Sequence, residues 1–114
     1  MKSKKSILIL LAIFLMLGSI SMRTEAATIT PDLQFTGTTA SCYVRLQQPG
    51  KVIVATMALW HGTTLVDSWS GTASNSLTLD KTHSSCVSGW TYTLKINGMI
   101  GGVAFSEITV SATC

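Results

Sequence analysis

The sequence predicts an all-β protein, built as a single antiparallel β-sandwich of about seven strands. Thr and Ser supply 15 and 10 of the 88 residues that follow position 26, together with Val, Ile and aromatic residues, a composition typical of strands and turns. No segment of this part shows sustained helical spacing of its apolar residues. Short apolar runs alternate with turn residues at intervals of about 8 to 12 residues, which is the spacing typical of a sandwich.

Residues 1–26 predict a secretory signal peptide. The first six residues, MKSKKS, are cationic, and residues 7–20 are apolar or small and carry no charge. This run is shorter than the roughly 20 apolar residues that span a bilayer, which favours a cleaved leader over a membrane anchor. We expect cleavage after Ala26, with Ala27 as a near alternative. Residues 27–114 then form a secreted, extracellular domain that has no membrane attachment.

The first core strand is predicted where Ala40, Cys42, Val44 and Leu46 alternate with more polar side chains. A Gln-Pro-Gly-Lys turn follows, because Pro fixes one backbone angle and Gly supplies the positive φ of the next residue. Residues 52–60 are apolar on both faces and therefore predict a central strand.

The rest of the chain alternates between short strands and turns. Turns or loops are expected at residues 61–63 and 71–74, and the Asn-Gly pair at 97–98 is a strong hairpin signal. The remaining strands are expected at residues 64–70, 77–81, 90–96 and 108–114.

The charge distribution excludes a general nucleic-acid-binding protein. Four of the eight cationic residues and one of the five acidic residues lie in the leader, so the net charge of +3 belongs to the leader and residues 27–114 are neutral. A neutral chain lacks the basic patch that phosphate backbones require. We expect partners to be recognised by shape, hydrogen bonds and aromatic contacts.

No spacing of residues predicts catalysis or a cofactor. A nucleophile needs an oriented base beside it, and the His and acidic residues after position 26 show no such arrangement. Asp80, His83 and Cys86 are three apart and could offer ligands to zinc, but no fourth ligand is apparent and an exposed Ser-rich loop explains them as well. We therefore expect neither an enzyme nor a metal site.

Three cysteines, Cys42, Cys86 and Cys114, follow the leader, and export favours disulfides. In a sandwich whose successive strands reverse direction, all three lie at one end of the domain. Cys42 shares a face with Val44, and Cys114 shares one with Val110, so both should point into the core from opposite sheets. We predict a Cys42–Cys114 disulfide with Cys86 as a free thiol. The alternatives are a Cys42–Cys86 bond and three unpaired, packed thiols.

Trp60, Trp69 and Trp90 could form an aromatic surface for a sugar or a protein, although a sandwich also buries a Trp between its sheets. If Ile53 and Leu59 face inward, Trp60 faces outward, and the opposite register would bury it. We favour the first register because it buries the larger side chains. Trp60 and Trp69 are our predicted binding residues.

Tyr92 has a structural explanation. It stands near the start of the penultimate strand, after a loop that ends with Gly89. Its hydroxyl can therefore bond to the loop backbone, an arrangement called a tyrosine corner. We prefer this role to a catalytic one.

Three short motifs mark the predicted strands, namely Ser68-Trp69-Ser70-Gly71, GWTYTLK at residues 89–95 and Ala40-Ser41-Cys42. Together they resemble a group of small secreted β-sandwich proteins of Gram-positive bacteria, similar to immunoglobulin and fibronectin-type domains. The resemblance covers most of residues 27–114. It implies an immunoglobulin-like sandwich used for adhesion, binding or scaffolding.

Two functions are compatible with these features. We favour a secreted, non-enzymatic binding module that contacts a protein or glycan through its loops and any exposed Trp, and two Trp rings on one exposed face would support it. The alternative is a secreted effector that acts between cells through Cys86, as a free thiol or in a disulfide-linked dimer.

Overall fold

The computed structural model describes residues 27–114, and this part of the chain is all β, with six strands and no helix. The strands are β2 (Thr28–Thr36), β3 (Thr39–His61), β4 (Thr64–His83), β5 (Thr91–Ile100), β6 (Val103–Ala104) and β7 (Ile108–Thr113). The all-β prediction is confirmed, and the predicted number of about seven strands is corrected to six. The predicted signal peptide lies outside the described residues.

The six strands form one antiparallel sheet in which β3 is central. Residues 39–47 of β3 pair with β2 and with residues 76–83 of β4, and we call these three segments the first half-sheet. Residues 52–61 of β3 pair instead with residues 64–74 of β4 and with β5. These segments, with β6 and β7 beside β5, form the second half-sheet.

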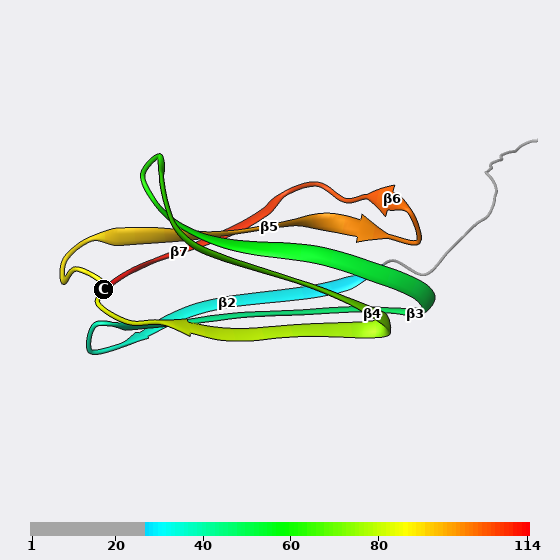
Figure 1. The fold of residues 1–114 in the computed structure, drawn as a ribbon, viewed down its shortest axis with the longest axis horizontal. Helices are drawn as coiled ribbons and strands as arrows, with labels where there is room; N and C mark the ends of the chain where they lie inside the picture. The colour runs from blue at the N-terminus through cyan, green and yellow to red at the C-terminus, as the bar shows by residue number, and fades with distance from the viewer. Residues whose placement is uncertain (1–26) are drawn as a thin grey trace, which may run out of the picture.

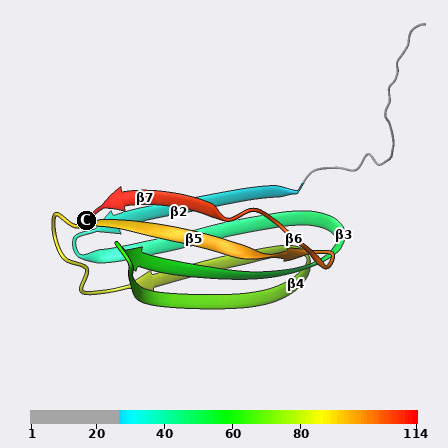
Figure 2. The same cartoon turned by 90° about the horizontal axis from the view of Figure 1, so that it is seen from above.

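The two half-sheets lie over one another because β3 and β4 both bend. In Figure 1, β2 lies in the lower band, and β5 and β7 lie in the upper band. The view from above shows β3 and β4 curving round at one end of the molecule (Figure 2). Both halves of each long strand therefore line the same interior.

The bend in β3 falls where the sequence predicts a turn. Gly50 has a φ of 79°, its N–H donates to Oδ1 of Asn75 at 2.8 Å, and Asn75 itself has a φ of 73°. The pairing register between β3 and β4 shifts between Gln47 and Val52. The two strands predicted on either side of this turn are therefore one 23-residue strand, β3, because β4 pairs with β3 both before and after the bend. The loop predicted at residues 71–74 is likewise part of β4.

The interior holds one hydrophobic core with side chains from both half-sheets. Before the bend the fully buried positions of β3 are Ala40, Cys42, Val44 and Leu46, and after it they are Ile53, Ala55, Met57 and Leu59. The inward positions change from even to odd numbers because the register shift at the bend adds residues to β3 alone. The register favoured from the sequence is confirmed, and it turns Trp60 outward.

The Asn97-Gly98 pair lies inside β5 rather than in a turn, which corrects the sequence prediction. A Cβ on Gly98 would overlap the carbonyl oxygen of Val54, so the close approach of β3 requires this glycine. The hairpin turn lies at Gly101 and Gly102, whose φ values of 61° and 80° supply the two consecutive positive angles of a type I′ turn.

Candidate functional site

Among the described residues, most of the large exposed hydrophobic side chains lie in one part of the molecule. On the strands they all belong to the second half-sheet, namely Val52, Val54, Leu65, Met99 and Val103. Val87 and Trp90 complete the set and lie between β4 and β5. The outer positions of the first half-sheet carry Thr, Ser, Asp, Gln, Arg and a single Tyr. The two outer surfaces therefore differ in character.

Trp60 lies on the outer surface of the second half-sheet, which is the more apolar of the two outer surfaces. The residue before it, Leu59, is fully buried, so the alternation along the strand turns the indole outward. Its register partners are Leu65 on β4, which is 51% exposed, and Thr93 on β5. Nζ of Lys95 lies 5.0 Å from the centre of the indole, within the range of a cation–π contact.

We define the outer apolar face as Trp60, Leu65, Val52, Val54 and Met99. The three β3 residues of this set share one side of the strand, and Met99 is the register partner of Val54. The described part of the chain contains no pocket. The outer apolar face is thus an open sheet surface, with Trp60 and Leu65 at one end and the other members toward the bend.

Trp69 and Trp90 do not join this surface. Trp69 is the register partner of Met57, which is fully buried, and it packs half-buried against the core. Trp60 and Trp69 therefore lie on opposite faces of the second half-sheet and do not present two rings on one exposed face. Trp90 is 44% exposed, and its ring stacks on His61 with the centroids 3.9 Å apart.

An aromatic cluster closes the end of the core where β3 turns into β4. The ring of Tyr92 lies 5.6 Å from that of His61 and 5.5 Å from that of Phe35. Tyr92 is buried, and its hydroxyl accepts a hydrogen bond from the N–H of Val87 at 2.8 Å. This contact between a strand and the preceding loop is the tyrosine corner predicted from the sequence, and it is confirmed.

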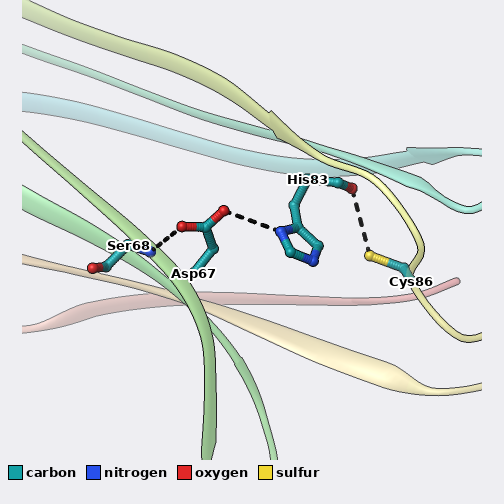
Figure 3. Close-up of polar contacts among 4 residues, drawn as sticks. All are labelled: Asp67, Ser68, His83 and Cys86. Atoms are coloured by element: carbon teal, nitrogen blue, oxygen red, sulfur yellow. Dashed lines mark hydrogen bonds and ion pairs between the residues drawn. The ribbon is translucent and has the colours of Figure 1, made fainter.

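Asp67 and His83 form a contact that the sequence did not reveal. Nδ1 of His83 lies 3.0 Å from Oδ2 of Asp67, and the other carboxylate oxygen accepts a hydrogen bond from the N–H of Ser68 at 2.9 Å (Figure 3). The two residues lie near opposite ends of β4 and in different half-sheets. Their contact joins the half-sheets, and it could be foreseen only by knowing that β4 belongs to both.

Asp67, His83 and Cys86 have the side chains of a catalytic triad, but they are not arranged as one. The thiol of Cys86 donates to the backbone carbonyl of His83 at 3.7 Å rather than to the imidazole (Figure 3). Cys86 is 5% exposed, and burial raises its pKa, which disfavours the thiolate needed for nucleophilic attack. Asp80, grouped with these residues in the sequence, points outward. Within residues 27–114, no three His, Cys, Asp or Glu residues are placed to hold a metal ion.

The three cysteines lie near the hairpin turn between β2 and β3, and all are free thiols in this structure. Cys42 is fully buried, and burial raises its pKa to about 12, with smaller contributions from Cys86 and Asp67. Cys114 is half-buried. The described residues contain no disulfide, and the Cys42–Cys114 bond stays a prediction.

No model of a known protein family matches the chain, and a search of curated proteins finds no relative. The resemblance to small secreted sandwiches of Gram-positive bacteria therefore stays a prediction. No helix within residues 27–114 has the length and apolar character needed to cross a membrane.

Proposed function

We propose that this protein is a secreted, non-enzymatic binding module that contacts a partner protein through the outer apolar face. The observation that carries the proposal is that four exposed hydrophobic side chains, Val52, Val54, Leu65 and Met99, share the outer surface of the second half-sheet with Trp60. Isolated apolar residues on a surface need no explanation, but several on one face are typical of an interaction site. Trp is also the side chain that most often dominates the free energy of binding at a protein interface.

We also infer that the bent sheet is an immunoglobulin-like β-sandwich. Two observations support this: both half-sheets contribute fully buried side chains to one core, and Tyr92 forms a corner contact of the kind found in immunoglobulin-like domains. Domains of this class keep a rigid core while their outer surfaces vary, which suits a binding role.

The chemistry of the face favours a protein over a glycan. Sugars stack on free aromatic planes, whereas Lys95 lies over the ring of Trp60. The other members of the face are Val, Leu and Met, which pack well against apolar side chains of a partner. Residues 27–114 have no net charge, so association depends on shape and apolar contact rather than on electrostatic steering.

Export is part of the proposal and is supported by the cationic and apolar leader. N-terminal sequencing of the protein recovered outside the cell should begin at Ala27. The alternative function, an effector that acts through Cys86, has weaker support because that side chain is only 5% exposed.

The proposal is tested by capture of partners on immobilised residues 27–114. Trp60→Ser and Leu65→Ser remove two members of the outer apolar face, and Tyr43→Ser is the matched control on the outer surface of the first half-sheet. A protein retained by the wild type and the control but lost from both face variants supports the proposal, provided that circular dichroism shows every variant to be folded. Equal retention by all variants contradicts it. If the wild type and the control instead bind a glycan array and Trp60→Ser does not, the partner is a glycan rather than a protein.

A further inference from the structure

Two of the three cysteines meet at one hairpin turn. Gly37 and Thr38 form the turn between β2 and β3. The backbone N–H of Cys86 donates to the carbonyl of Thr38 at 2.8 Å, and the thiol of Cys114 donates to the carbonyl of Gly37 at 3.5 Å. Cysteines that are distant in sequence thus bind adjacent carbonyl groups.

The backbone also fastens Cys114 to the segment that carries Cys86. The N–H of Gly89 donates to the carbonyl of Cys114 at 3.0 Å, and the N–H of Cys114 donates to the carbonyl of Trp90 at 2.9 Å. These bonds continue the pairing of β5 with β7 beyond the strands. The hydroxyl of Tyr92 holds the same segment at Val87. The fold therefore keeps Cys86 and Cys114 near one another.

Cys42 has different surroundings from Cys114. It lies inside β3 between Leu33 and Lys81, and its side chain is fully buried. With a pKa of about 12, caused first by burial, it stays a neutral thiol at physiological pH. Cys42 and Cys86 are both buried, whereas Cys114 is half-buried and is therefore the most accessible of the three thiols to an oxidant.

We propose that Cys86 and Cys114 form the disulfide of the exported protein and that Cys42 is left as a buried, unreactive thiol. This pairing differs from the Cys42–Cys114 bond predicted from the sequence, because backbone hydrogen bonds hold Cys114 beside the segment that carries Cys86, whereas Cys42 is fully buried inside β3. The bond would tie the segment before β5 to the end of β7, beside the aromatic cluster. It is independent of the outer apolar face.

The bond forms by exchange with a low-molecular-weight disulfide such as oxidised glutathione. The thiolate of Cys114 attacks the S–S bond of the oxidant, which forms a mixed disulfide and releases one thiol. Cys86 then loses its proton, and its sulfur attacks the sulfur of Cys114 and releases the second thiol. Because burial raises the pKa of Cys86, this is the slower of the two steps. The protein loses two electrons and two protons, and the oxidant takes up both as two thiols.

Tryptic mapping separates every pairing, because cleavage after Arg45, Lys81 and Lys95 places each cysteine on a different peptide. Reduced residues 27–114 are oxidised in a glutathione buffer, and the remaining thiols are then alkylated at low pH in denaturant. Mass spectrometry without reduction should show residues 82–95 linked to residues 96–114, with Cys42 alkylated. A link from Cys42 to either other cysteine overturns the proposal, as does a chain with three alkylated thiols.

Two variants are used so that the test still gives a result if one of them fails to fold. Cys42→Ala should form the same linked peptide pair as the wild type, since it keeps both partners. Cys86→Ser should form no intramolecular bond and should carry glutathione on Cys114. If Cys86→Ser instead forms a Cys42–Cys114 bond as fast as the wild type forms its own bond, the pairing predicted from the sequence is right and the proposal is wrong.

Discussion

The outer surfaces of the two half-sheets differ, although the same two strands, β3 and β4, build much of both. In the first half-sheet the outer positions are hydroxyl, amide or charged side chains around one half-buried Tyr. In the second half-sheet Val52, Val54, Leu65 and Met99 are exposed on the same outer surface as Trp60. The inner surfaces of both supply fully buried side chains to the same core. Burial in the core therefore explains the apolar residues on the inner surfaces of both half-sheets. It does not explain the apolar residues on the outer surface of the second half-sheet.

This difference separates what the fold needs from what a partner needs. A sheet that faces water on one side is stable with polar residues on that side, and the outer surface of the first half-sheet is polar in this way. Exposed apolar groups gain no stability from folding, and they raise the risk of association. Their concentration on one outer surface is the reason to assign binding to that surface.

The largest effect is expected where the pairing of the second half-sheet is broken. Gly98→Ala places a Cβ against the backbone of Val54 and 2.8 Å from the Cα of Ala55, so β3 and β5 must separate. We expect a loss of about 3 kcal/mol in the free energy of unfolding, measured with urea.

Gly37→Ala is the matched control in the turn of the first half-sheet. Its φ is 62°, but no heavy atom lies within 4 Å of the new Cβ, so only backbone strain acts and the loss should be about 1 kcal/mol. Equal losses in the two variants would contradict the close approach of β3 to Gly98.

The second prediction concerns binding rather than stability. Trp60→Ser should weaken the affinity for the captured partner by about 2 kcal/mol, or roughly 30-fold, because it removes the largest side chain of the outer apolar face. The urea midpoint should change little, since Trp60 is outside the core. Titration calorimetry measures the affinity, and Tyr43→Ser should bind as the wild type does.

The third prediction uses pH to probe the inner surface of the first half-sheet. In the folded, reduced protein the pKa of Cys42 is raised from 9.0 to about 12, first by burial. The unfolded chain therefore loses this proton at lower pH than the folded chain does. The stabilisation is complete below pH 9 and falls by about 1.4 kcal/mol per pH unit above it, until the pKa of the folded state. Urea unfolding with a reductant should show this slope in the wild type. An equally steep slope in Cys42→Ala would show that another group causes it.

The smallest effect is expected at the contact between the half-sheets. Asp67→Asn removes the partner of His83 at a partly exposed site, so the loss of stability should be less than about 1 kcal/mol at low salt and pH 6. Added salt should reduce the difference further. Asp80→Asn, at an exposed outer position, should have a smaller effect than Asp67→Asn.

Local alternation predicted the buried side of β3, and a Tyr after a Gly-ended loop predicted the corner at Tyr92. These features depend on neighbours close in sequence. The turn signal at Gly50 was also correct, but a local signal cannot tell a reversal from a bend. That outcome depends on whether β4 pairs with both flanks, which is a contact between distant segments.

The features that the sequence did not specify share the same cause. Gly98 is required by the approach of β3, and the contact between Asp67 and His83 exists only because β4 spans both half-sheets. The face on which Trp69 lies is likewise set by its pairing with Met57. Each depends on a register that no short stretch of sequence specifies.

The most direct test of the binding surface places one charge on each outer surface. Thr56 and Thr78 are both exposed threonines: Thr56 lies beside Asn97 in the second half-sheet, and Thr78 lies beside Arg45 in the first. We predict that Thr56→Arg abolishes binding of the captured partner in titration calorimetry, whereas Thr78→Arg keeps the affinity within about twofold of the wild type. Full binding by Thr56→Arg, or loss of binding only in Thr78→Arg, would contradict the assignment of binding to the second half-sheet.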